Sequence, residues 1–388
     1  MSEIKNSNLS KAKSAKNDEF YTQYNDIEKE MQAYLDYDPN VFRGKTILLP
    51  CDDPHWSNFT KYFAQNFERF GLKKLISTSY AHISKHLQAD YQASLFEKQS
   101  PIYDEVKSVE KGKIYILDKD TNKDGKVDIN DLQYQYLSGT GDFKTDEIKA
   151  LRDEADMIIT NPPFSLFREF LAWIIEANKK FTIIGNMNAI TYKDVFPLIK
   201  NNEVWLGATI SSGDREFRVP DSYPLEAAGT RIDDEGNKYI RVKGVRWFTN
   251  LDYKERHEDL ILYKKYNEEN YPKYDNFDAI NIDVTKEIPM DYKGYMGVPI
   301  TFMDKYNPEQ FEIIALGIVG SIDFTCNKKM EIFNKQGELT GKYTFNAKGT
   351  LYKKYNPKID KTPSFKDCKT GELYKSIYAR IIIKNKRI

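Results

Sequence analysis

The chain has 388 residues, which is enough for two domains with a full α/β core in one of them. Its 40% hydrophobic and 30% charged residues are typical of a globular protein, and no apolar run reaches the roughly 18 residues of a membrane span. The net charge of zero gives by itself no indication of a polyanionic partner, and the polar N-terminus is not that of a signal peptide, so we expect a cytoplasmic protein.

Helical and strand patterns alternate through the first part of the chain. Residues 1–16 are polar and are expected to form a disordered basic arm, followed by a helix-capping run at Asn17–Glu19. Apolar residues at helical spacing between Ile27 and Leu35 predict one helix, and Gly71 ends a second helix that carries an aromatic stripe. The other elements expected here are strands at Thr46–Leu49, Leu72–Ser77, Met157–Thr160 and Phe181–Ile184, and helices at Leu166–Ala177 and before Trp205. This alternation predicts an α/β fold with a doubly wound, mostly parallel sheet.

The pattern changes from about Arg241 to short strand-like runs separated by Gly and Pro. Such runs predict a C-terminal mixed α+β region. The strands expected in it are Val245–Phe248, Leu260–Tyr263, Val298–Phe302, Phe311–Leu316 and Ile377–Ile383. We place the boundary near residue 265, which divides the chain into 1–265 and 266–388.

Positive charge gathers at the end of the chain. Residues 331–388 carry 14 Lys and Arg against 5 Asp and Glu, a net charge of +9. Aromatic residues alternate with these lysines, which favours a nucleic-acid surface. Solvated lysines around packed strand aromatics are the alternative. The aromatic residues concerned are Tyr343, Phe345, Tyr352, Tyr355, Phe365, Tyr374 and Tyr378.

The most informative motif is Asn161-Pro162-Pro163-Phe164, directly after the apolar run Ala155–Thr160. Both prolines lack an N–H and fix φ, so the strand cannot continue and a stiff loop follows it. Open α/β sheets bind ligands at this end of their strands. There the Asn161 side-chain oxygen and the Pro162 carbonyl can accept from one amino group beside the flat ring of Phe164. This combination suits methyl transfer to an amino nitrogen.

Two further segments carry carboxylates at expected loop positions. Asp52 and Asp53 follow the first strand without a G-x-G-x-x-G pattern, which argues against a dinucleotide and favours a cofactor with an amino acid portion. An Asp-rich turn before a helix is the alternative. In Gly141-Asp142-Phe143, the carboxylate could accept from an adenine amino group beside the aromatic ring, although a turn explains this tripeptide equally well.

Together these segments resemble the adenine-specific DNA methyltransferases, most closely those of the EcoRI type. Asn-Pro-Pro-Phe alone is shared with amino-methyltransferases that act on RNA or on glutamine side chains. The longer segments narrow the resemblance to the EcoRI type. It covers about residues 17–320. The matching segments are Asp18–Thr22, Leu49–Pro54, Ser57–Phe59, Gly141–Phe143, Asn161–Ser165, Ile184–Ile190, Trp247–Leu251 and Met296–Phe302.

The resemblance implies S-adenosylmethionine as methyl donor and N6 of a flipped-out adenine in double-stranded DNA as acceptor. It implies that Asn161, Pro162 and Phe164 are catalytic and hold the target base. The usual glycine-rich first motif is replaced by Pro50-Cys51-Asp52-Asp53-Pro54, which leaves the contacts of Asp52 and Asp53 open. The cofactor-binding residues implied are Phe20, Tyr21, Thr22, Pro50, Asp52, Asp142 and Phe143, of which Asp142 and Phe143 would hold the adenine.

A second aromatic side chain should cover the other face of the flipped base. Phe217 and Trp247 are the candidates, with a place in the hydrophobic core as the alternative for each.

The segment Asp120–Asp131 matches a calcium-binding loop at six of its positions. Its last position is Asp rather than Glu, and the residues before it, Gly112–Leu117, predict a strand rather than a helix. A polar β-hairpin with Asp-Gly in its turn is therefore the preferred interpretation. The three cysteines and four histidines are too scattered for a metal cluster, so no metal is expected.

The leading hypothesis is a sequence-specific DNA adenine-N6 methyltransferase, with residues 1–265 as the catalytic domain and 266–388 as the target-recognition region. Double-stranded DNA is the expected partner, a restriction endonuclease is a partner by function only, and the protein is expected to be a monomer that contacts no membrane. Methylation of RNA adenine or of a protein glutamine, and a vestigial DNA-binding protein, are the alternatives.

Overall fold

The structure is a computed structural model that describes residues 20–53, 57–81, 100–209, 214–219, 223, 229–325 and 328–388. Its internal contacts divide the chain into two compact units. The first comprises the described residues up to Ala189 together with Val204–Lys254, and the second comprises Ile190–Glu203 and Glu255–Ile388. The expected arm and the expected capping run at Asn17–Glu19 lie outside the described residues. No helix of the described part is long and apolar enough to cross a bilayer.

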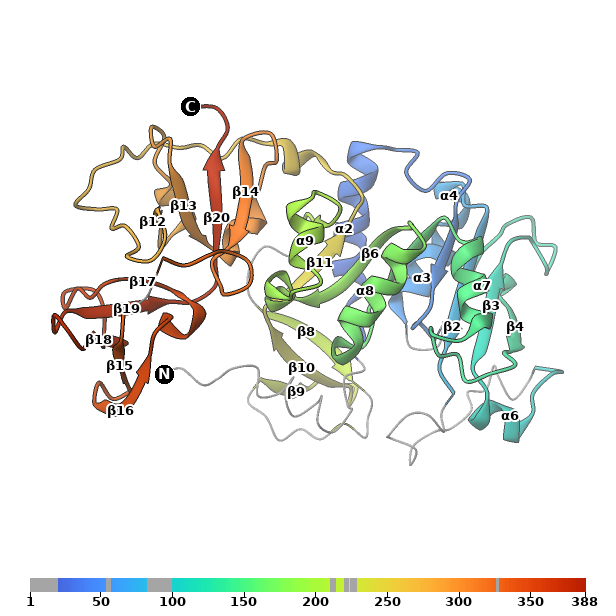
Figure 1. The fold of residues 1–388 in the computed structure, drawn as a ribbon. Coiled ribbons are helices and arrows are strands. Elements are labelled where there is room, and N and C mark those ends of the chain that lie inside the picture. The colour runs from blue at the N-terminus through green and yellow to red at the C-terminus, as the bar shows by residue number, and fades with distance from the viewer. Residues whose placement is uncertain are drawn as a thin grey trace. The chain divides into compact units, whose positions relative to one another are not determined.

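The first unit is built on an eight-stranded sheet with the order β4-β3-β2-β1-β5-β6-β11-β7 (Figure 1). Its four central strands, β2, β1, β5 and β6, are parallel, and the outer strands on both sides pair antiparallel. The expected mostly parallel sheet is therefore found only at its centre. The strands are β1 (Thr46–Leu49), β2 (Lys74–Ser79), β3 (Lys113–Leu117), β4 (Gln133–Tyr136), β5 (Met157–Thr160), β6 (Lys180–Asn186), β7 (Trp205–Leu206) and β11 (Val245–Thr249).

Helices cover both faces of this sheet because its central strands are apolar on both sides. Every residue of β1 and β5 is buried, as is typical of parallel strands. On one face, α2 (Tyr24–Tyr37), α3 (Asn58–Gln65) and α4 (Phe67–Phe70) share a hydrophobic core with Ile47 and Ile159. The other face is covered by α8 (Phe167–Glu176) (Figure 1). Its Phe167 ring packs against Phe248, with 4.9 Å between ring centroids. The other α-helices described in this unit are α6 (Glu105–Glu110) and α7 (Asp146–Glu154).

Two glycines shape the elements next to the loops of interest. A Cβ at Gly185 in β6 would lie 2.3 Å from the Phe167 ring, so glycine allows the start of α8 to approach the sheet closely. Gly71 has φ 63° and ends α4 in the left-handed conformation, as the sequence predicts. The single helix expected before Gly71 is divided at Asn66, whose φ of −105° and ψ of 12° separate α3 from α4.

A three-stranded antiparallel sheet is inserted between β7 and β11. It consists of β8 (Asp214–Val219), β10 (Lys238–Lys243) and β9 (Thr230–Ile232), in the order β8-β10-β9. Tyr21 forms an isolated antiparallel bridge with Arg218 of β8. The described N-terminal residues therefore lie along the edge of this insertion.

The second unit contains two sheets and the helix α9 (Phe196–Lys200). The first sheet has the order β12-β13-β20-β14 and the second has the order β16-β15-β18-β19-β17. The strands of the first sheet are β12 (Ala279–Asn281), β13 (Tyr295–Pro299), β14 (Phe311–Leu316) and β20 (Arg380–Asn385). Those of the second are β15 (Met330–Phe333), β16 (Leu339–Thr344), β17 (Leu351–Lys354), β18 (Phe365–Asp367) and β19 (Leu373–Ile377).

Three expected strands of this unit differ from the structure. Leu260–Tyr263 forms no strand, because the side chain of Gln310 takes the place of a partner strand and bonds both the N–H and the carbonyl of Leu260. The expected strand Ile377–Ile383 is two strands of different sheets, β19 and β20, separated at Ala379 with φ 47°. The run Val298–Phe302 ends as a strand at Pro299 and continues as a 3₁₀ helix at Ile300–Lys305.

Candidate active site

The proline pair forms a tight corner at the carboxyl end of β5. Thr160 is the last residue of the strand, and a 3₁₀ turn at Phe164–Leu166 leads directly into α8. Pro163 has φ −53° and ψ 126°, and its carbonyl accepts a hydrogen bond from the Leu166 N–H at 2.9 Å. The strand ends as the sequence predicts, because neither proline has an N–H for the ladder.

The side chain of Asn161 is fixed at one end and has no partner at the other. Its Nδ2 donates to the Phe20 carbonyl oxygen at 2.6 Å and to Thr22 Oγ1 at 3.3 Å. These two acceptors identify the nitrogen end of the amide. Its Oδ1 is buried and has no hydrogen-bond partner among the described residues. Since a buried unpaired acceptor costs about 1–3 kcal/mol, this oxygen is the kind of atom that a ligand amino group would satisfy.

Three aromatic rings from distant parts of the chain meet beside Asn161. Phe164 lies edge-on to Phe20, with 5.4 Å between centroids, and to Phe217, at 6.4 Å. Phe20 and Phe217 are 5.7 Å apart and both buried, whereas Phe164 is only partly buried. Phe164 therefore retains surface for a flat ligand, and the other two rings support it from behind.

Trp247 does not belong to this cluster. It is fully buried in β11, where its ring packs edge-on against Phe59 at 6.0 Å. Neither face of its indole is open to a base in this structure, so its place is that of a core residue. Phe217, with 2% exposure, likewise has no open face, although it contacts the partly buried Phe164.

Asp52 is the centre of a buried hydroxyl network at the end of β1. Its Oδ1 accepts from Ser57 Oγ at 2.6 Å and its Oδ2 accepts from Thr160 Oγ1 at 2.5 Å. Burial raises the pKa of Asp52 to about 6, and the two hydroxyl hydrogen bonds oppose this rise. The carboxylate thus links β1, the start of α3 and the residue immediately before Asn161.

The end of β2 supports the same loop. The N–H of Asp52 donates to the Thr78 carbonyl at 3.0 Å, and Thr78 Oγ1 donates to the carbonyl of Pro50 at 3.1 Å. Ser77 Oγ donates to the Asp52 carbonyl. Asp53, by contrast, is only half-buried. Of the two neighbouring carboxylates, Asp53 is therefore the one with more access to a ligand.

Asp142 lies next to the end of β2. Its Oδ2 accepts from the Tyr80 hydroxyl at 2.9 Å and its Oδ1 accepts from the Lys144 N–H at 2.9 Å. Burial and the bond to Asp142 raise the pKa of Tyr80. Each carboxylate oxygen has a second lone pair, so Asp142 can still accept from an amino group.

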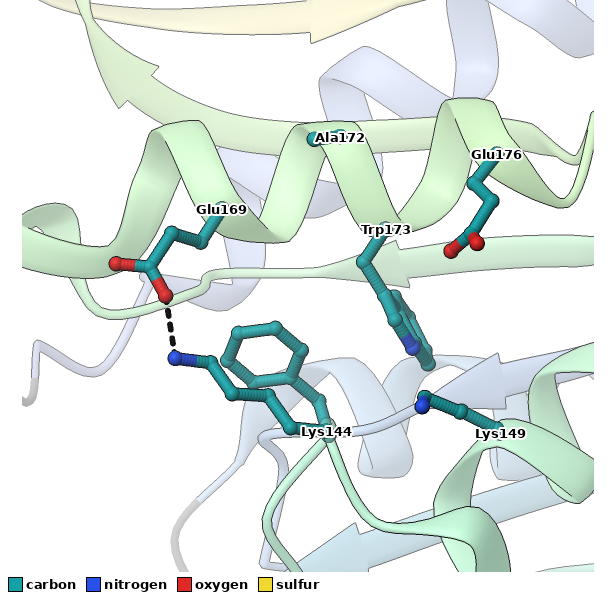
Figure 2. A pocket seen from close by; sticks show the side chains of 7 residues that line it. Lys144, Lys149, Glu169, Ala172, Trp173 and Glu176 are labelled. Atoms are coloured by element: carbon teal, nitrogen blue, oxygen red, sulfur yellow. Dashed lines mark hydrogen bonds and ion pairs between the residues drawn. The ribbon is translucent and has the colours of Figure 1, made fainter.

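The side chain of Phe143 faces a different part of the unit. Its ring packs edge-on against Phe170 and Trp173 of α8, with centroids 5.2 and 5.7 Å away. Together with Trp173 it lines a surface pocket of about 400 Å³ between α7 and α8, at whose rim Lys144 pairs with Glu169 (Figure 2). A contribution of Phe143 to an adenine site would therefore come from its backbone rather than from its ring.

The structure brings Phe20, Thr22, Asn161 and Phe164 into one place and ties Asp52 to it through Thr160. No role for Thr160, Ser57, Tyr80 or Ser79 follows from the sequence. The hydroxyl of Ser79 is buried without a partner among the described residues. Their positions, at or directly after the end of a strand or just before a helix, are the only signal that the sequence offers. Hydroxyl residues are common at such positions for structural reasons alone.

The Asp120–Asp131 segment is the connection of a β-hairpin, since β3 and β4 on either side pair antiparallel. Its carboxylates accept backbone N–H bonds within the loop: Asp120 from Lys123 and Gly125, and Asp131 from Thr121. No cluster of His, Cys, Asp and Glu suited to a metal ion occurs in the part of the chain that the structure describes.

The residues at the carboxyl ends of β1 and β2 fit a cofactor of the S-adenosylmethionine kind. Such a molecule offers an ammonium group, ribose hydroxyls and an adenine amino group. Asp53 and Asp142 supply acceptors, and Ser79 Oγ is a buried hydroxyl that lacks a partner among the described residues. The unpaired Asn161 Oδ1 lies at the neighbouring strand end, where a second ligand would be met.

Comparison with known proteins agrees with this geometry. The family model described as "Adenine-specific methyltransferase EcoRI" matches residues 8–386. Type II methyltransferase M.EcoRI of Escherichia coli is 46% identical over 328 residues, which cover 84% of this chain and 94% of that protein. Type II methyltransferase M.MpnI of Mycoplasma pneumoniae is 35% identical over 310 residues, 79% of this chain and 84% of that protein.

A third relative, Type II methyltransferase M.MgeORF184P of Mycoplasma genitalium, is 35% identical over 312 residues, 79% of this chain and 85% of its own length. No solved structure gives a significant match. The family model spans nearly the whole chain, including every candidate site residue, and the chain therefore belongs to the EcoRI family of adenine-specific methyltransferases.

Proposed function

We propose that this protein is a sequence-specific DNA methyltransferase that transfers a methyl group from S-adenosylmethionine to N6 of an adenine flipped out of duplex DNA. The observation that carries the proposal is the buried, unpaired Oδ1 of Asn161 beside the partly buried ring of Phe164. An adenine offers both an amino group for that oxygen and a flat ring for that phenylalanine.

The cofactor is proposed to lie along the carboxyl ends of β1 and β2, at the parallel centre of the sheet. Asp53 and the Pro50 loop would face its amino acid and ribose portions, and Asp142 would accept from its adenine amino group. Asp52 supports this loop from inside, because both of its oxygens are engaged by the hydroxyls of Ser57 and Thr160. When bound, the cofactor supplies an electrophilic methyl group.

The residues of the chain mainly position the base. Flipping an adenine out of a duplex costs a few kcal/mol in lost stacking and pairing, and stacking on an aromatic ring such as Phe164 returns about 1–3 kcal/mol. The hydrogen bond to Asn161 Oδ1 draws the N6 lone pair away from the purine ring, which makes the amino nitrogen a better nucleophile. Because the corner holds the base in a fixed position, methyl transfer avoids much of the entropy cost of bringing two free reactants together.

The two units are proposed to divide the work, the first as catalytic domain and the second as target-recognition region. The basic residues 331–388 fit contact with DNA phosphates. The relatives are named as type II methyltransferases, which supports a role in restriction and modification beside a partner endonuclease. We propose a monomer in the cytoplasm, where its DNA substrate lies. Methylation of RNA or of a protein glutamine finds no support among these relatives, and neither does a vestigial role.

The first test is Asn161→Ala. Methyl transfer should fall by about 100-fold or more, as for loss of a group that stabilises the transition state, while S-adenosylmethionine binding stays nearly unchanged. Single-turnover transfer of labelled methyl groups to duplex DNA measures the first quantity and calorimetric titration the second. Near-normal transfer by the variant would contradict the role of Asn161.

The acceptor itself can be tested with the unaltered protein. Labelled cofactor is incubated with duplex DNA, RNA and protein substrates in parallel, and N6-methyladenine is expected only in the DNA. Methyl groups recovered in RNA or in glutamine would overturn the proposed substrate. Sequencing that detects methylated adenine then identifies the recognition site.

A further inference from the structure

We propose that the segment Phe20–Thr22 orients the Asn161 amide, so that Thr22 is a positioning residue for methyl transfer. The inference rests on the proposed function, because it assumes that Asn161 Oδ1 accepts from the target amino group. It goes beyond the expected cofactor contact of this segment, since it assigns Thr22 an effect that acts through Asn161.

An amide side chain has nearly the same shape after a half-turn about its last bond, so packing alone does not decide which end faces the ligand. Hydrogen bonds decide it here. The Phe20 carbonyl oxygen at 2.6 Å can only accept, and Thr22 Oγ1 lies 3.3 Å from the same nitrogen. The reversed amide would set Asn161 Oδ1 against the Phe20 carbonyl and point an NH₂ group at the target NH₂. The observed orientation is therefore the only one that presents an acceptor to the substrate.

The segment that makes these bonds is itself held on several sides. The N–H and carbonyl of Tyr21 exchange hydrogen bonds with Arg218 of β8, at 2.9 and 3.2 Å. Asn58 at the start of α3 donates through Nδ2 to the Thr22 carbonyl at 2.8 Å. The Phe20 ring is buried between Phe164 and Phe217. The two acceptors therefore keep their positions when the amide is replaced.

This arrangement predicts that asparagine and aspartate at position 161 differ in activity. Aspartate has nearly the same size and offers two acceptor oxygens, so a requirement for an acceptor alone would allow it. Against the fixed Phe20 carbonyl, however, one carboxylate oxygen would meet another oxygen at about the 2.6 Å now spanned by the hydrogen bond. The Thr22 hydroxyl, 3.3 Å from this position, can donate to the carboxylate, but it leaves the repulsion from the Phe20 carbonyl in place, so aspartate should leave the productive position.

The first experiment compares Asn161→Asp with the unaltered protein in single-turnover transfer to duplex DNA containing the recognition site. The orientation inference predicts a loss of about 100-fold or more, with S-adenosylmethionine affinity changed by less than about threefold. Transfer by Asn161→Asp within about threefold of the unaltered protein would overturn the inference, because it would show that any acceptor suffices.

The second experiment uses a matched pair at Thr22. Thr22→Val keeps the shape and removes the acceptor, whereas Thr22→Ser keeps the hydroxyl. Thr22→Val should lower the single-turnover rate at saturating cofactor by about 3- to 10-fold, the range for one lost hydrogen bond, because the Phe20 carbonyl still holds the amide. Thr22→Ser should restore most of the rate that Thr22→Val loses, because it returns the hydroxyl to the Asn161 amide. A loss that acts through Asn161 appears in the rate at saturating S-adenosylmethionine and is therefore separate from any change in cofactor affinity.

Other outcomes at Thr22 overturn the inference in distinguishable ways. If Thr22→Val weakens cofactor binding and leaves the saturated rate unchanged, Thr22 is a cofactor contact and not a positioning residue. If both variants lower the melting temperature and the rate together, the role of the residue is structural. If the unaltered protein methylates no DNA, the proposed function fails and the inference fails with it, whereas full activity of Thr22→Val removes the inference alone.

Discussion

Asp52 shows how one buried carboxylate can hold together two loops of the candidate site. Its two oxygens accept from Ser57 before α3 and from Thr160 at the end of β5. The same side chain thereby joins the proposed cofactor loop to the residue that precedes Asn161. The cost is electrostatic, because a charged group is held where only hydroxyls solvate it.

The raised pKa of Asp52 predicts a pH-dependent stability. Burial raises this pKa to about 6, above the usual value of 3.8, so the folded protein binds the proton more tightly than the unfolded chain. The stabilisation is fully present below about pH 4 and is lost as the pH rises through about 6, for a total of about 3 kcal/mol. Relative to the variant Asp52→Asn, the unaltered protein should therefore become less stable over this range.

Urea denaturation of both proteins between pH 4 and pH 7 measures the difference in unfolding free energy. Asp53→Asn is the matched control for loss of a carboxylate from the same loop, because Asp53 is only half-buried. A difference between the unaltered protein and Asp52→Asn that stays constant across this range would show that the carboxyl group does not titrate as described.

Single residues differ in how well a sequence reveals them. Asn161 and Phe164 can be chosen as candidate site residues from the sequence, because a proline pair after an apolar run has few structural explanations. The hydroxyl of Thr160 cannot, because its partner Asp52 is 108 residues away and only the folded chain brings them together. For the same reason the sequence alone does not separate the buried Asp52 from the more exposed Asp53.

At the scale of elements, α2 is tied to the segment after β7 by one fully buried glutamate. Glu30 accepts from the N–H groups of Ala208 and Thr209, both at 2.9 Å, and from the Tyr34 hydroxyl at 2.6 Å. A Cβ at Gly207 would lie 2.0 Å from Glu30 Oε1, so glycine is needed for this close approach. Glu30 thus fixes the point where the chain leaves the main sheet for the β8–β10 insertion.

The variant Glu30→Gln should lower the free energy of unfolding by about 1–3 kcal/mol. One backbone N–H would face the new NH₂ group rather than an oxygen, and a buried donor without an acceptor costs about 1–3 kcal/mol. Denaturation followed by tryptophan fluorescence measures the change. The exposed Glu28→Gln on the same helix is the control and should stay within about 0.5 kcal/mol of the unaltered protein. Equal stability of the two variants would exclude an anchoring role for Glu30.

Whole elements were predictable where their own residues determine them. The parallel strands β1 and β5 follow from short apolar runs, and α8 follows from helical periodicity. The segment Leu260–Tyr263 has the same local character, but Ile261 is 83% exposed and the available bonding partner is the side chain of Gln310. Strand formation depends on a partner, and the sequence of one segment does not contain it.

At the scale of the whole molecule, charge is separated although the net charge is zero. The two compact units differ in composition, and the basic residues 331–388 belong to the second. The opposite charges of the two units cancel in the net charge of the chain, but the electrostatic field differs from one unit to the other. The affinity for a polyanion should therefore fall as the salt concentration rises, and this dependence should come mainly from the second unit.

This separation predicts the salt dependence of DNA binding. Replacing four exposed lysines of the second unit by glutamine should reduce the slope of log K against log salt by about 0.9 for each lysine that contacts a phosphate. Cofactor affinity should not change. The lysines are Lys342, Lys358, Lys361 and Lys369. Binding to labelled duplex DNA across a salt series measures the slope.

The matched control replaces four exposed lysines of the first unit by glutamine. They are Lys29, Lys73, Lys119 and Lys126. The control should keep the slope of the unaltered protein. An equal reduction by both sets would mean that DNA is held by general attraction rather than by the second unit.

The three-ring cluster of Phe20, Phe164 and Phe217 has a consequence for assembly. Its members come from parts of the chain that are far apart in sequence, and the bond from Asn161 to Phe20 spans 141 residues. A polypeptide that lacks the segment at Phe20 can thus still contain the central strands, but its candidate site is incomplete. The candidate site is therefore complete only when the segment at Phe20 packs against Phe164 and accepts the hydrogen bond from Asn161.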